Sequence, residues 1–72
     1  MAADTTTHDP LCRATAAALA AHFGGRLSRK VVSRAVAQAR HDLEGRIQPE
    51  ALAEMLHHLA RHRLDALIPA RA

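Results

Sequence analysis

Apolar side chains recur every three or four residues along most of this 72-residue chain, which is the spacing of amphipathic helices. Asp9 is a good N-cap, Pro10 suits a first helical position, and Gly24-Gly25 is a typical helix stop. These signals predict a first helix over residues 10–23. Its apolar positions fall on one face: Cys12, Ala16, Leu19 and Phe23.

A second amphipathic pattern begins after Ser28, another N-cap residue, and stops before Gly45. It predicts a helix over residues 28–44 with an apolar stripe formed by Val32, Val36, Ala39 and Leu43. On its solvated faces we expect two ion pairs at i,i+4 spacing, Asp42 with Arg46 and Arg40 with Glu44.

The third pattern predicts a helix over residues 49–67, opened by Pro49 and ended by Pro69. It has two apolar strips. The first contains Leu52, Met55, Leu56, Leu59 and Leu67, and the second contains Ala53, Ala60 and Leu64. Because one bundle core can cover only about one strip, we expect the second strip to form a dimer interface.

Three helices with short connections predict an all-α three-helix bundle over residues 9–68, with a disordered segment at 1–8 and a C-terminal tail at 69–72. Composition adds a reason for self-association. Alanine supplies much of the 49% hydrophobic content, and only 17 side chains are large and apolar. So small a core leaves a lone bundle marginally stable, which favours a homodimer.

Composition also excludes several classes of function. No apolar run is long enough for a membrane span, and the N-terminal residues do not follow the signal-peptide pattern. A single cysteine favours a reducing cytoplasm. The absence of Trp and Tyr argues against nucleic-acid binding by base stacking. The net charge of +3 is only mildly basic.

The stretch from Leu19 to Leu64 resembles a family of small bacterial three-helix-bundle domains. The shared positions are Leu19/Phe23, Val32/Val36, Leu43, Ile47 and the segment Ala60-Arg61-His62-Arg63-Leu64. Such domains occur alone as uncharacterised proteins or at the N-terminus of arsenate-reductase-like, low-molecular-weight-phosphatase-like enzymes. The resemblance implies a dimerisation module.

The same resemblance implies no arsenate or phosphate chemistry for this chain. The phosphatase-like enzymes need a Cys-x5-Arg phosphate loop, and the residue six positions after Cys12 is Ala18. Cys12 itself lies near a helix N-terminus, where a thiol can be activated, but it shares the apolar face and is better interpreted as a small buried side chain. We therefore expect no enzyme activity and no cofactor.

Six histidines suggest a metal site as an alternative. His58 and His62 have the i,i+4 spacing that can place two imidazoles on one Zn²⁺, His57 is adjacent, and Glu54 lies one turn before His58. The competing interpretation is a solvated helix surface on which Glu54 pairs with His58. A dimer would double the available ligands.

A second alternative is DNA binding. The segment from Leu19 to Arg40 resembles a helix-turn-helix, with Arg29, Lys30 and Arg34 at the start of the helix that would read DNA. Arg26 would join these three in attracting phosphates. The turn from Gly24 to Ser28 is longer than usual, and the acids of the third helix weaken the basic balance. The sequence therefore argues against nucleic acid as a partner.

Arg63 leaves a further question open. Its helical position follows the Leu52–Leu56–Leu59 seam, so it either extends along the end of the core or reaches an acid of a partner chain, such as Asp42 or Glu44. Overall, the sequence predicts a non-catalytic cytoplasmic homodimerisation module that can also contact another protein, with no membrane role.

Overall fold

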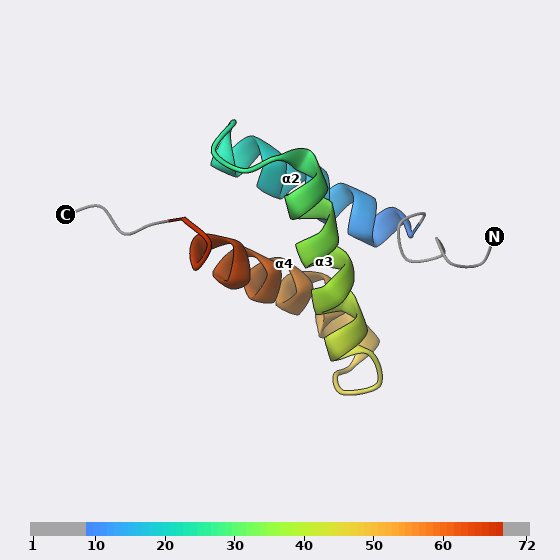
Figure 1. Ribbon diagram of the computed structural model, residues 1–72. Helices are drawn as coiled ribbons and strands as arrows, with labels where there is room; N and C mark the ends of the chain where they lie inside the picture. The colour runs from blue at the N-terminus through green and yellow to red at the C-terminus, as the bar shows by residue number, and fades with distance from the viewer. Residues whose placement is uncertain (1–8, 69–72) are drawn as a thin grey trace.

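The computed structural model describes residues 9–68, and within them the predicted all-α fold is confirmed (Figure 1). Helix α2 spans Pro10–Phe23, α3 spans Arg29–Leu43 and α4 spans Pro49–Asp65. Helix α3 crosses the other two and packs against both, and α2 and α4 also contact each other (Figure 1). The predictions for residues 1–8, for the tail at 69–72 and for Pro69 lie outside the described residues.

The ends of α2 follow from local chemistry. The Asp9 side chain accepts a hydrogen bond from the backbone N–H of Leu11, at 2.8 Å, and Pro10 occupies the first turn. At the other end, Gly24 has φ 59° and ψ −124°, a backbone conformation that glycine adopts readily. Its N–H donates to the carbonyl of Ala20. The predicted range 10–23 is therefore confirmed.

The other two helices are slightly shorter than predicted. Ser28 stands outside α3 as its N-cap and accepts from the N–H of Val31 at 3.1 Å, so the helix begins one residue later than expected. Glu44 is extended and ends α3. Helix α4 stops at Asp65 rather than 67, because the chain tightens into i+3 turns in which Leu67 and Ile68 donate to Leu64 and Asp65.

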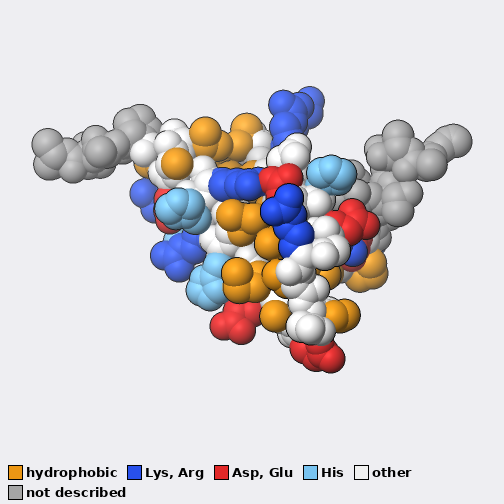
Figure 2. Space-filling model, turned by 90° about the horizontal axis from the view of Figure 1, so that it is seen from below, with side chains coloured by type: hydrophobic (Ala, Val, Ile, Leu, Met, Phe, Trp, Pro, Cys, Tyr) orange, Lys and Arg blue, Asp and Glu red, His pale blue; other side chains and the backbone are white. Residues whose placement is uncertain are grey.

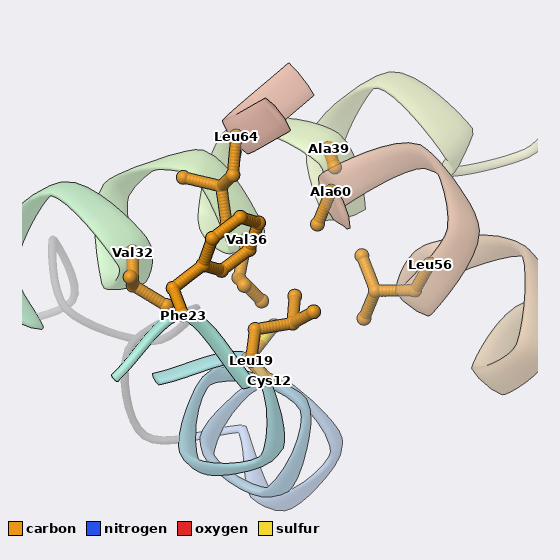
Figure 3. Close-up of a cluster of buried hydrophobic side chains, with 9 residues drawn as sticks. All are labelled: Cys12, Leu19, Phe23, Val32, Val36, Ala39, Leu56, Ala60 and Leu64. Atoms are coloured by element: carbon orange, nitrogen blue, oxygen red, sulfur yellow. The ribbon is translucent and has the colours of Figure 1, made fainter. Parts of the chain in front are cut away.

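The core is one cluster to which each helix contributes three side chains (Figure 3). It consists of Cys12, Leu19 and Phe23 from α2, Val32, Val36 and Ala39 from α3, and Leu56, Ala60 and Leu64 from α4. Thr15 is also buried, which the apolar pattern did not indicate. Three of the nine are alanine or cysteine, so the interior holds few large side chains.

Candidate functional site

The two predicted apolar strips of α4 are not divided between core and surface as expected. Ala60 and Leu64, assigned to a dimer interface, are 0% exposed in the single chain and pack in its core beside Leu56. A second chain cannot reach them in this fold, so their assignment to an interface is wrong. Only Ala53 of that predicted interface is exposed. The reason is the orientation of α4 about its own axis, which places Leu56, Ala60 and Leu64 against α2 and α3.

This orientation of α4 leaves other apolar side chains at the surface. Met55 is 41% exposed, and Leu52 and Leu59, at spacings of three and four residues from it, are half-buried. These three residues form the apolar face of α4, a name kept below. Figure 2 shows hydrophobic side chains gathered on the side of the molecule seen from below, among histidine, acidic and basic side chains.

Charge is divided unevenly between the two halves of the described chain. Residues 9–41 contain six Lys or Arg and one acid, a net charge of +5, whereas residues 42–68 contain three Arg and five acids, a net charge of −2. The overall charge of +3 hides this division. Within residues 9–41 Asp9 is the only acid, although α3 also carries Asp42 just beyond this range.

Asp9, the only acid within residues 9–41, forms an ion pair with Arg40. Arg40 donates from Nε to the carboxylate of Asp9 at 3.1 Å, joining α3 to the start of α2. The hydrogen bond from the Leu11 N–H, followed by the bond from Arg40, holds the pKa of Asp9 below its ordinary value against the opposing effect of burial.

The remaining cations of this half make no ion pair with any residue of the described range, and all are exposed. We call them the basic surface, formed by Arg13, Arg26, Arg29, Lys30 and Arg34. The three residues proposed from sequence for DNA binding, Arg29, Lys30 and Arg34, are thus together at the start of α3. Arg26, which lies in the turn just before α3, was also expected from the sequence to attract phosphates. Arg13 was not expected, because the sequence alone does not bring α2 beside α3.

A groove of about 590 Å³ lies between α2 and α3. Arg13 lines it from α2 and Arg29 from α3, and Ser33 also lines it. The rest of the lining is small, namely Pro10, Cys12, Ala14, Ala16, Ala17, Ala20 and Ala37. The groove is therefore bordered by cations and lined by small side chains rather than built from large apolar anchors.

The proposed metal ligands are not assembled. In the described part of the chain, no three His, Cys, Asp or Glu side chains come together in an arrangement that could hold a metal ion. The Nε2 atom of His58 lies 3.9 Å from the carboxylate of Glu54, and the rings of His57 and His58 are perpendicular, with centroids 6.4 Å apart. His62 is exposed and joins neither contact. The helix-surface interpretation describes these residues better.

Cys12 is buried and unbonded to another cysteine. Burial, reinforced by the nearby carboxylate of Asp9, raises the pKa of its thiol, although Arg40 opposes this shift. A buried thiol that stays protonated is a poor nucleophile. The sequence-based interpretation of Cys12 as a small core residue therefore agrees with its position.

Comparisons with known proteins assign no family. No family model, no curated protein and no solved structure matches the chain. What is established is a small three-helix all-α domain. Across residues 9–68, no helix combines the length and apolar character needed to cross a bilayer.

Proposed function

We propose that this chain is a non-catalytic protein-interaction module that pairs with a second copy of itself through the apolar face of α4. The observation that carries the proposal is Met55, a large apolar side chain that is 41% exposed at the centre of a helix. Leu52 and Leu59 flank it at helix-repeat spacing and are only half-buried. Covering these side chains would remove apolar surface from water.

The arrangement suits a two-fold pair. If two α4 helices lie antiparallel, Leu52 of one chain faces Leu59 of the other, and Met55 lies close to the axis. Each chain then presents the same patch, as a closed two-fold interface requires. The small core supports the need for such a contact, since a bundle of this size gains stability from additional buried apolar surface.

The chemistry of the described residues also favours binding over catalysis. Cys12 is buried, and this burial raises the pKa of its thiol. The histidines of α4 lie on its surface, where one contacts Glu54 and none joins a group of three potential ligands in the described range. These features supply neither an activated nucleophile nor a preformed metal centre.

Sedimentation equilibrium at micromolar concentrations tests the proposal. We expect a dimer of the 7.8 kDa chain, and a melting temperature that rises with protein concentration. Met55→Glu should give a folded monomer, because it places a charge in the contact. Ala53→Glu adds the same charge on another side of α4, where the side chain is exposed, and should leave the dimer intact. A wild-type monomer whose melting temperature does not depend on concentration would overturn the proposal.

A further inference from the structure

We propose that the basic surface binds the phosphate backbone of duplex DNA, with α3 as the helix that lies along the duplex. This binding function is separate from pairing through α4. It rests on the five exposed cations of the basic surface and on the charge division of the described chain, +5 over residues 9–41 against −2 over residues 42–68.

The exposed side of α3 has the shape that close approach to a duplex requires. Arg29, Lys30 and Arg34 are exposed near its start, and the small residues Ser33 and Ala37 lie between and beyond them. Small side chains there let the helix axis come near the DNA while the longer cations reach outward. A helix with its side chains is about 10–12 Å across, so it fits the major groove, which is about 12 Å wide.

The cations come from three separate parts of the fold. Arg13 lies in the first turn of α2, Arg26 lies in the connection between α2 and α3, and the rest lie on α3. Arg13 and Arg29 border one groove, so α2 and α3 carry cations on the same side of the molecule. A polyanion with regularly repeated charges can contact several of them at once, whereas a single carboxylate cannot.

The groove also favours DNA over an acidic protein segment. Protein interfaces depend on a few large anchors, often aromatic or long aliphatic side chains that fill pockets. Here half of the lining residues are alanine, and the only long side chains are Arg13 and Arg29. Electrostatic contact with phosphates needs no such anchors, and it supplies most of non-specific DNA binding.

The net negative charge of residues 42–68 would orient the protein as it approaches DNA. Glu50, Glu54 and Asp65 are exposed on α4, and DNA repels them while it attracts the basic surface. Arg40 is not part of the contact, because it is held by Asp9. The expected complex is therefore dominated by phosphate contacts and has little sequence preference.

Fluorescence anisotropy with a labelled duplex of mixed sequence, repeated over a series of salt concentrations, tests the inference. About four phosphate contacts would give a slope of about −3.6 for log affinity against log salt, or roughly 150-fold weaker binding between about 50 and 200 mM. Lys30→Gln combined with Arg34→Gln should reduce the magnitude of the slope by about 2. Both side chains are exposed, so the double variant should melt as the wild type does.

A matched control removes the same charge from the other half of the molecule. Arg46 and Arg61 are exposed, and the double variant Arg46→Gln, Arg61→Gln has the same net charge as the test variant. We expect it to retain the wild-type slope. Equal losses in both double variants would overturn the inference, because they would show a response to net charge alone. So would tighter binding of polyglutamate than of the duplex at equal charge concentration, which would point to an acidic protein.

Discussion

Arg63 of α4 donates to the carboxylate of Asp42 on α3, and the Nη2 and Oδ2 atoms are 2.7 Å apart. The sequence left open whether this arginine extends along the core or reaches a partner chain, and the structure gives it an acid of its own chain. The hydrogen bond from Arg63 is the main reason that the pKa of Asp42 lies below its ordinary value. The pair ties α3 to α4 at a half-exposed site.

Exchanging the two charged residues tests whether this ion pair stabilises the packing of α3 against α4. Asp42→Arg alone and Arg63→Asp alone each place like charges together, so each should lower the melting temperature. The double exchange should recover most of the loss, because it restores an opposite-charge pair across the two helices. Thermal melts at low ionic strength measure the recovery, and added salt should diminish it.

Arg61 and Asp65 provide the comparison for the charge exchange. They lie on the same helix at i,i+4 spacing, with 3.8 Å between Nε and Oδ2, and both are more exposed than the pair above. Exchanging them should change the melting temperature less. Equal coupling in the two pairs would contradict a specific role for the contact between Arg63 and Asp42.

Asp9 combines two roles that substitution can separate. Asp9→Ala removes both the cap of α2 and the partner of Arg40, and it should cost about 1–2 kcal/mol of unfolding free energy. Asp9→Asn keeps a side-chain oxygen that can accept from the Leu11 N–H, so it should cost less. Urea denaturation of the three proteins at neutral pH gives the comparison.

The lowered pKa of Asp9 adds a pH dependence with a definite sign. The unfolded chain binds a proton at this carboxyl at higher pH than the folded chain does. The stabilisation is therefore complete above about pH 5 and is lost as the pH falls through the folded pKa. The difference in melting temperature between wild type and Asp9→Asn should shrink on acidification. A difference that is constant from neutral to acidic pH would contradict the lowered pKa of Asp9.

Local signals were enough to predict the elements of the fold. Capping residues, glycines and apolar spacing act within a few residues of each other, so the helices begin and end within two residues of the predicted positions. The orientation of α4 about its own axis was not predictable in this way. Leu52, Leu56 and Ala60 lie near one another on the helix, and only packing against α2 and α3 decides which become buried.

Contacts between distant residues escaped prediction for the same reason. The sequence suggested local pairs for Arg40 and Asp42 on α3, whereas the structure pairs Arg40 with Asp9 and Asp42 with Arg63. Partners 31 positions apart, as Asp9 and Arg40 are, cannot be recognised from helical spacing. By contrast, the pair of Glu54 and His58 was predicted, because both lie on one helix turn.

The turn after α2 yields a test of backbone conformation. Gly24 has φ 59° and ψ −124°, and only glycine adopts that combination at low cost. Gly24→Ala should destabilise the protein by about 1–3 kcal/mol, even though a Cβ there would meet no atom within 4 Å. Gly25 has no positive φ and equally open surroundings. Gly25→Ala should therefore be neutral or slightly stabilising, by up to about 1 kcal/mol, and similar losses in both variants would contradict the assignment of strain to Gly24.

Leu64 distinguishes a core residue from an interface residue most directly. It is 0% exposed within one chain, so Leu64→Ala should cost about 2–5 kcal/mol of unfolding free energy through lost burial and the cavity left behind. Leu67, three residues later, is 58% exposed, and Leu67→Ala should change stability by no more than about 0.5 kcal/mol. Urea midpoints measured in the Met55→Glu background separate folding from pairing, because that variant is expected to be monomeric. If Leu64→Ala weakened only the pairing of the wild-type chain and left the monomer's urea midpoint unchanged, Leu64 would belong to the interface and the packing of α4 described above would be wrong.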